Sequence, residues 1–569
     1  MRKIYILLSM IPVALAAQNF TEIQTGMNNF YYSAADIADM DNNGTLDIVM
    51  NGAIDSDGDG NVDSTFNEVY QNNGTTLLPY ANLGNDVTHL GDIKFIDFNN
   101  DGLMDIISTG LSYMDVVNYK QYRFKNTGTG FVKEADLRGK IYGSMEVFDF
   151  NHDGKSDYAL NGTQYIDGIG FRNTLDYYKN TGSDFDMTGN WVDGTQNGSF
   201  KMVDLNNDHL LDLVIIGSDM NGNPVSKVYM NQAGVLVHTQ DLDPVAVGKI
   251  DFADFNADGF QDIVIIGKDA NDDGYFAVLM NDGTGVLTPQ PIAAADISDA
   301  SVSIGDLNND GYYDFIISGN ENYDAVVKTY MYDVANHKFI EGSLTGLANL
   351  GGPGLVHLFD FNNDHHLDVL LSGFDWAGAD LPSLTKVFTN NAADTNLKPT
   401  APTNLNVTKN GNRFNFSWSG ASDDKTPVNA LRYEIKVGTT QGAQDVAKYI
   451  VTTPSWFLDL DPAVQNVYWS VKAIDASKAY SDASTESTLG IRENKVKTDL
   501  MIYPNPASDK VYIKGENVSE AEMYSMDGKK LNVILNGDQS VDVSHLPKGV
   551  YLLKLKIKNE ITTRKLTVK

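Results

Sequence analysis

A nine-residue acidic pattern, Asp-x-(Asp/Asn)-x-(Asp/Asn)-(Gly/His)-x-x-Asp, occurs seven times in this chain. Its copies start at Asp39, Asp97, Asp149, Asp204, Asp254, Asp306 and Asp360, at intervals of 50 to 58 residues. A short apolar run precedes each copy, another follows it, and a glycine falls five residues after the last aspartate. Such a regular interval indicates a structural repeat rather than a bias of composition.

Each unit reads as four short strands. The apolar runs on either side of the acidic loop have the length of buried strands, and most units continue with a third strand that ends in an Asn-rich turn and a weaker fourth. Repeated four-stranded units predict an all-β fold, a seven-bladed β-propeller over residues 18–395. The last unit stops after its third strand, and we expect the strand at 19–24 to complete it and close the ring.

The composition is typical of an exported protein. Residues 1–17 combine Arg2, Lys3, an apolar stretch and small residues, which predicts a signal peptide. No other stretch is long and apolar enough for a transmembrane helix, and the absence of cysteine excludes disulfides and thiolate sites. A formal net charge of −33 argues against nucleic acid as a partner. We expect a secreted or surface-attached monomer.

The acidic loop carries the oxygen ligands that calcium prefers. Side chains at positions one, three, five and nine can converge on one ion together with the backbone carbonyl of position seven, and glycine at position six permits a positive φ. The predicted ligands, loop by loop, are Asp39, Asp41, Asn43, Thr45 and Asp47; Asp97, Asn99, Asp101, Leu103 and Asp105; Asp149, Asn151, Asp153, Lys155 and Asp157; Asp204, Asn206, Asp208, Leu210 and Asp212; Asp254, Asn256, Asp258, Phe260 and Asp262; Asp306, Asn308, Asp310, Tyr312 and Asp314; and Asp360, Asn362, Asp364, His366 and Asp368.

Two other interpretations of the loops are an EF-hand and a metal-free turn. The pattern opens like an EF-hand but has no glutamate at position twelve and is flanked by strands, so we reject an EF-hand. The loops could also be ordinary Asn/Asp/Gly turns without metal. His209 and His365 replace the glycine in two copies, at some cost in strain, and we expect His365 and His366 to be solvated turn residues rather than zinc ligands.

These units resemble the FG-GAP or VCBS-type repeats of integrin-α-like propellers. The resemblance rests on the acidic loop, the apolar strand and the glycine that recur together. It implies that the seven acidic loops bind calcium on one face, while ligands use the opposite face, formed by the loops between second and third strands and between successive units.

The loops between second and third strands differ from unit to unit. The first contains Asp55, Asp57, Asp59 and Asp63 at ligand spacing, which predicts an eighth calcium site. Several others carry an aromatic residue that could stack on a sugar or anchor a protein, or could simply pack on neighbouring loops. These ligand-face candidates are Tyr113, Tyr165, Tyr275, Tyr323 and Trp376.

Two further domains follow the repeats. After a linker at 396–400, residues 401–490 resemble a fibronectin type III β-sandwich with Trp418 and Tyr433 as core aromatics, and we expect a spacer or accessory binding role. After a second linker at 491–499, residues 500–569 resemble the small β-sandwich sorting domain of type IX secretion substrates, through YPNPASD, MYSMDGKKL and VDVSHLPKGVYLLKL. This resemblance implies the type IX secretion machinery as a partner.

Two classes of function remain open. The first is an adhesion protein or a glycan- or protein-binding protein stabilised by calcium. The second is a polysaccharide lyase or glycosidase built on the propeller, which needs a positioned acid and base. Tyr165, Arg172, His89 and His238 are scattered candidates for that chemistry, and they form no motif.

Overall fold

The computed structural model describes residues 18–54, 62–84, 88–112, 119–290, 292, 296–322, 324–375, 382–392, 395–488, 501–514, 518–525, 529–557 and 560–569. The expected signal peptide lies outside these residues, as do Asp55, Asp57, Asp59, Tyr113, Tyr323 and Trp376. The described chain is all β, with a single 3₁₀ turn at Val428–Ala430 and no helix that could cross a membrane. It forms two compact units, divided between Leu489 and Gly490.

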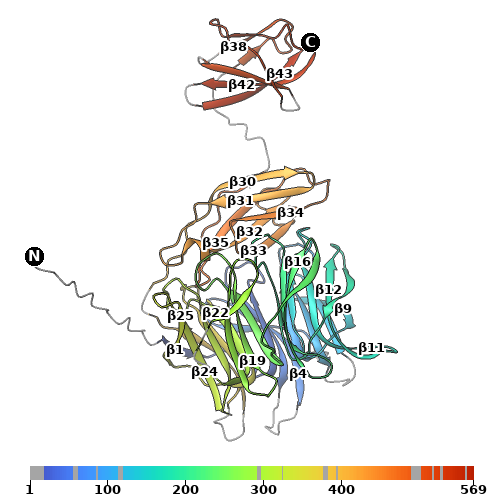
Figure 1. Ribbon diagram of the computed structural model, residues 1–569, viewed down its shortest axis with the longest axis vertical. Helices are drawn as coiled ribbons and strands as arrows, with labels where there is room; N and C mark the ends of the chain where they lie inside the picture. Colours follow the sequence, from blue (N-terminus) through green and yellow to red (C-terminus); the bar gives the residue numbers. More distant parts are fainter. Residues whose placement is uncertain are drawn as a thin grey trace, which may run out of the picture. The chain divides into compact units, whose positions relative to one another are not determined.

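Seven sheets occupy residues 18–390 of the described chain (Figure 1). In the first six sheets, four antiparallel strands follow one another in chain order. These are β2 (Tyr31–Ala38), β3 (Asp47–Ile54), β4 (Ser64–Asn72), β5 (Leu77–Asn82); β6 (Thr88–Ile96), β7 (Asp105–Ser112), β8 (Tyr119–Asn126), β9 (Phe131–Arg138); β10 (Met145–Phe148), β11 (Asp157–Ile166), β12 (Gly170–Asn180), β13 (Phe185–Asp193); β14 (Phe200–Val203), β15 (Asp212–Ser218), β16 (Pro224–Gln232), β17 (Val235–Asp241); β18 (Val247–Ala253), β19 (Asp262–Lys268), β20 (Gly274–Asn281), β21 (Leu287–Gln290); and β22 (Ile297–Gly305), β23 (Asp314–Glu321), β24 (Asp324–Asp333), β25 (Lys338–Glu341).

The seventh sheet joins the two ends of this region. It contains β27 (Gly351–Phe359), β28 (Asp368–Phe374), β29 (Ser383–Asn390), β1 (Gln18–Ile23) and β26 (Leu344–Thr345). Strand β1 pairs antiparallel with β29, from Phe20 opposite Asn390 to Ile23 opposite Val387. The prediction that the N-terminal strand completes the last unit is confirmed.

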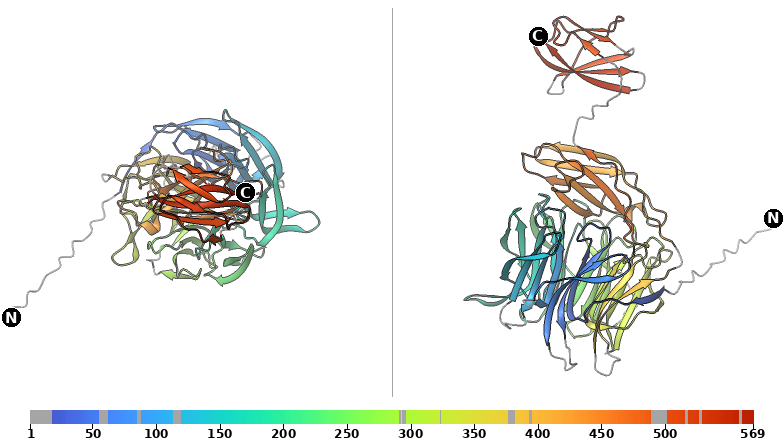
Figure 2. Two further views of the ribbon diagram at one scale, coloured as in Figure 1. Left: turned by 90° about the horizontal axis from the view of Figure 1, so that it is seen from above. Right: turned by 180° about the vertical axis from the view of Figure 1, so that it is seen from behind.

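The first strands of the seven sheets surround a common centre. Contacts run from β2 through β6, β10, β14, β18 and β22 to β27, and β27 contacts β2 again, so the sheets form a closed ring (Figure 2). The second strands are buried over most of their length, and β15 over all of it, because neighbouring sheets cover both faces. Phe30 and Ile48 of the first sheet share a core with Phe359 and Leu370 of the seventh, which seals the closure.

The repeated glycine allows the second strand to approach the first strand closely. At Gly217 φ is +136°, and a Cβ atom there would lie 2.7 Å from the Thr195 hydroxyl. A side chain at this position would therefore collide with the segment that leads into β14.

Residues 395–488, called here the middle sandwich, form two facing sheets. One contains β30 (Thr403–Asn410), β31 (Arg413–Ser419) and β34 (Ser455–Asp459); the other contains β33 (Ala447–Val451), β32 (Arg432–Gly438), β35 (Tyr468–Ile474) and β36 (Ser487–Thr488). Trp418 and Tyr433 lie in its core with their rings 5.4 Å apart, as predicted. The predicted linker at 396–400 is fixed to the sandwich, because the buried Asn396 amide donates a 2.7 Å hydrogen bond to Asp475.

The C-terminal unit is a separate, smaller pair of sheets. These contain β37 (Met501–Tyr503), β38 (Lys510–Lys514) and β41 (Ser540–Asp542), and β40 (Lys530–Leu531), β39 (Glu520–Ser525), β42 (Gly549–Ile557) and β43 (Glu560–Val568). Val511, Met523, Leu553 and Leu566 form the centre of its core.

Candidate functional site

The seven acidic loops share one backbone shape. Position six has a positive φ, between 88° and 95° in the five loops with glycine and 69° and 68° at His209 and His365. Position four also has a positive φ, between 55° and 59°, which the sequence pattern did not indicate. Its residues are Asn42, Asn100, His152, Asn207, Ala257, Asn309 and Asn363. Asparagine and histidine tolerate this region better than most residues, so the loop turns sharply twice.

Backbone amides hold the acidic side chains inside each turn. In the second loop, Asp97 accepts hydrogen bonds from the amides of Asp101 and Gly102 at 3.1 and 2.8 Å. Asn99 accepts from the Asp101 amide at 2.9 Å, and Asp101 accepts from the Leu103 amide at 3.0 Å. Positions one, three and five therefore present their oxygens towards one another. Coordination by the carbonyl of position seven remains a prediction.

The aspartate at position nine fixes the loop to its own sheet. Asp105 accepts from the amides of Phe98, at 3.2 Å, and of Asn126, at 2.7 Å, and the same pair of bonds recurs in the other six loops. All seven position-nine aspartates are fully buried. Burial raises the pKa of Asp105 to about 8 and that of Asp47 to about 7.

An asparagine at the end of the third strand connects adjacent sheets. The Asn126 side-chain amide donates to the carbonyl of Met104 in its own loop, at 3.1 Å, and to that of Met40 in the preceding loop, at 3.2 Å. Asn72, Asn180 and Asn281 make the equivalent bonds, and Asn72 reaches Phe361 across the ring closure. The sequence indicated only that these residues form turns. Their hydrogen bonds between neighbouring sheets, called here the inter-sheet clasps, were not predicted.

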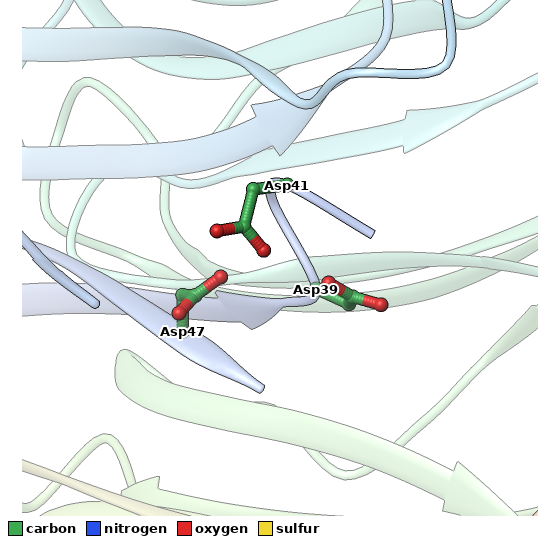
Figure 3. A group of neighbouring side chains, drawn as sticks. All are labelled: Asp39, Asp41 and Asp47. Carbon is green, nitrogen blue, oxygen red and sulfur yellow. The ribbon is translucent and has the colours of Figure 1, made fainter. Parts of the chain in front are cut away.

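The first loop gathers three carboxylates. In the described part of the chain, Asp39, Asp41 and Asp47 form the group whose ligand atoms all lie within 4.8 Å of one another. Figure 3 shows that all three come from one turn, with Asp47 at the start of β3. Oxygen donors at this spacing fit a divalent cation such as calcium. All seven loops carry three aspartates and one asparagine at positions one, three, five and nine, with the asparagine at position five in the first loop and at position three in the other six.

The histidines of the seventh loop are not both solvated. His365 is 37% exposed and lies 3.6 Å from Asp360, but His366 is only 8% exposed and its Nδ1 lies 3.2 Å from Asp364. The expectation of a solvated His366 is therefore wrong, because the ring folds back onto the position-five carboxylate of its own loop.

The middle sandwich covers the acidic-loop face of the ring. His152 of the third loop stacks on Phe457, with 4.1 Å between ring centroids. Lys425 Nζ donates to the Asn309 carbonyl of the sixth loop at 2.8 Å, and Asn100 of the second loop donates to the Val446 carbonyl at 3.0 Å. A spacer or accessory binding role is expected for this domain, and the structure adds that position-four residues of several acidic loops contact it.

A cavity of about 1210 Å³ runs through the centre of the ring. The side chain three residues before each acidic loop points into this region, and six of these seven positions hold an ionisable group. In ring order they are Asp36, Lys94, Glu146, Lys201, Asp251, Ser303 and His357. Lys201 lies 2.9 Å from Glu146 and 3.9 Å from Asp251, and Lys94 lies 3.9 Å from Asp36. A belt of alternating charge thus lines the acidic-loop end of the cavity.

The two described ligand-face candidates differ in surroundings. Tyr165 is 44% exposed at the β11–β12 hairpin and meets Phe171 edge-to-face at 5.3 Å. Tyr275, at the start of β20, is half-buried and its hydroxyl donates to Asp243 at 3.3 Å. The catalytic candidates are not assembled: Tyr165 and Arg172 lie on adjacent strands, but His89 is buried in the second sheet and His238 lies on the outer strand of the fourth.

Comparisons with known proteins define the C-terminal unit. Residues 501–569 match the secretion system C-terminal sorting domain. The protein is secreted or attached to the outer cell surface. Residues 97–160, which contain the second and third acidic loops, and residues 254–317, which contain the fifth and sixth, match the FG-GAP-like repeat.

Individual relatives cover only part of the chain or resemble it weakly. The chain is 32% identical to beta-agarase D of Zobellia galactanivorans over 107 residues, which are 18% of this chain and 22% of that enzyme. Among solved structures, it is similar to the exotype rhamnogalacturonan lyase YesX, with 12% identity and a TM-score of 0.39 over 67% of this chain and 75% of that one. It is also similar to AofleA from Arthrobotrys oligospora, with 13% identity and a TM-score of 0.33 over 58% of this chain and 94% of that one.

Proposed function

We propose that the protein is a calcium-binding, seven-bladed β-propeller that binds an extracellular glycan or protein ligand at the cell surface or beyond it. Seven sheets in a closed ring, each with the same acidic loop between its first and second strands, support the propeller and the calcium sites. The three- and four-stranded sheets of the middle sandwich, with Trp418 and Tyr433 between them, support a fibronectin type III-like domain.

The position of the middle sandwich is the main support for a ligand site on the face opposite the acidic loops. Because this domain packs on the second to sixth acidic loops, the metal face is occupied by the chain itself. The opposite face retains exposed aromatic and apolar side chains, among them Tyr165, Ile169 and Phe171 on one hairpin. Exposed aromatic groups of this kind suit sugar stacking or a protein anchor.

A binding screen tests this proposal. The mature chain from residue 18 is offered to an array of extracellular glycans and matrix proteins, once with calcium and once with a chelator. We expect binding to one ligand class that is lost or weakened by the chelator. Depolymerisation of an added polysaccharide would instead establish the lyase or glycosidase alternative, and absence of any ligand would contradict the proposal.

A further inference from the structure

The rim of the central cavity opposite the acidic loops carries unusual backbone geometry. The residue seven before the loop has a positive φ in five sheets: Tyr32, Leu90, Tyr142, Asn197 and Asp299, between 48° and 58°. Tyrosine and leucine rarely adopt this conformation, and such outliers cluster at functional sites. Backbone hydrogen bonds link neighbouring rim residues. The Tyr142 amide donates to the Leu90 carbonyl at 2.8 Å, and the Asn197 amide donates to the Tyr142 carbonyl at 2.6 Å.

The rim has two unlike halves. On the first three sheets it presents Tyr32, Leu90 and Tyr142, and the two tyrosines are 41% and 42% exposed. On the fifth and sixth sheets it presents acidic groups, of which Asp272 and Asp299 lie within 3.4 Å of Lys268. A ligand with flat sugar faces would therefore lie along the tyrosine side.

Deeper in the cavity, two ammonium groups have no carboxylate within ion-pair distance among the described residues. In the described chain, Lys249 and Lys478 form no ion pair within 4.0 Å, in contrast to Lys94 and Lys201. Lys249 points from β18 into the cavity, where water reaches it. Lys478 comes from the middle sandwich, at the tip of a turn with φ of 63°, and donates to the Leu358 carbonyl at 2.8 Å.

These observations define a composite site at the centre of the ring. We propose that the central cavity binds a carboxylate-bearing saccharide, with the acid group near Lys249 and Lys478 and a sugar ring against Tyr32 and Tyr142. The inference rests on the proposed glycan-binding function and adds the place and the charge of the ligand. It also gives the middle sandwich a direct part in binding, through Lys478.

The test compares acidic and neutral oligosaccharides on the mature protein in saturating calcium. Trigalacturonate and galactotriose are titrated calorimetrically into the wild type, Lys249→Met and the matched control Lys338→Met, whose lysine is exposed on the outer strand β25. Lys249 makes no ion pair in the described chain, so its replacement should leave the fold intact, which is checked by thermal melting.

We expect trigalacturonate to bind at least tenfold more tightly than galactotriose. Lys249→Met should remove most of that difference, and Lys338→Met should leave it unchanged, because Lys249 faces the cavity and Lys338 lies outside it. Equal affinity for the two sugars, or an unchanged preference in Lys249→Met, would overturn the cavity site. If neutral glycans from the array still bind in that case, the proposed function stands without it; if no glycan or protein binds, both fall.

Discussion

The His152 ring of the third acidic loop stacks on the Phe457 ring of the middle sandwich, with 4.1 Å between centroids and 29° between planes. In the same contact, the Asp459 amide donates to the His152 carbonyl at 2.7 Å. The Arg413 guanidinium lies over the Phe457 ring, 3.9 Å from the ring centroid. The loop and the sandwich are therefore joined by both backbone and side chain.

Replacing Phe457 with alanine should weaken this docking. Loss of a nearly buried aromatic side chain costs about 3–5 kcal/mol. We expect residues 18–488 to unfold in one transition in the wild type, and that transition to split or to start at lower temperature in Phe457→Ala. Differential scanning calorimetry measures this, with Ile450→Ala, an exposed change in the same sandwich, as the control. A transition that stays single and unshifted in Phe457→Ala would show that the two parts are not coupled here.

Removing one inter-sheet clasp should destabilise the ring. Asn126→Ala removes the side-chain donor from the carbonyls of Met40 and Met104, and the Met40 carbonyl keeps only the Met104 amide, at 3.3 Å. We expect a cost of about 1–3 kcal/mol in the free energy of unfolding. Urea denaturation provides the measurement. Thr129→Ala, three residues along in the exposed turn, should change stability by less than about 0.5 kcal/mol, and equal effects of the two substitutions would refute the clasp.

The charge belt predicts a pH dependence on the acid side. Burial and the ammonium groups of Lys94, Lys478, Lys201 and Lys249 lower the pKa of His357 to about 3, against 6.5 without these influences. Below pH 6.5 the unfolded state binds a proton at His357 that the folded state does not bind. The free energy of unfolding is therefore unaffected by this group above pH 6.5 and decreases as the pH falls from 6.5 towards 3. Asp36, Glu146 and Asp251 also face the belt and oppose part of the effect.

The measurement is a difference between two proteins. Between pH 7 and pH 5 we expect the wild type to lose about 1–2 kcal/mol more stability than His357→Gln, which cannot titrate in this range. Parallel pH profiles of the two proteins would mean that His357 is protonated as easily in the ring as in the unfolded chain.

The first acidic loop offers a direct test of one metal site. Asp41→Ala removes one of three gathered carboxylates, and we expect the mature protein to lose calcium affinity at one site by at least tenfold. Asp324→Ala, on the exposed start of β24, is the matched loss of charge. An identical calcium titration for wild type and Asp41→Ala would exclude the first loop as a binding site.

The repeat made much of the ring predictable. Its interval defined the four-stranded units, and the missing fourth strand after β29 pointed to the pairing with β1, since an open edge needs a partner. The charge belt was not visible, because the residue three before the loop changes from Asp36 to Lys94 to Glu146 and only the closed ring makes these neighbours. The docking of the middle sandwich was missed for a similar reason: it uses backbone carbonyls such as those of Val446 and Asn309, which any sequence provides.

Calcium binding by the mature chain is the most direct test of the account. Metal-free protein is titrated with calcium by isothermal calorimetry while its melting temperature is followed. We predict about seven ions per chain, with an eighth if the loop at 55–63 also binds, and a rise in melting temperature, since a ligand of the folded state stabilises it by about 2.7 kcal/mol per site at a hundredfold excess over Kd. No bound calcium and an unchanged melting temperature would contradict the central claim.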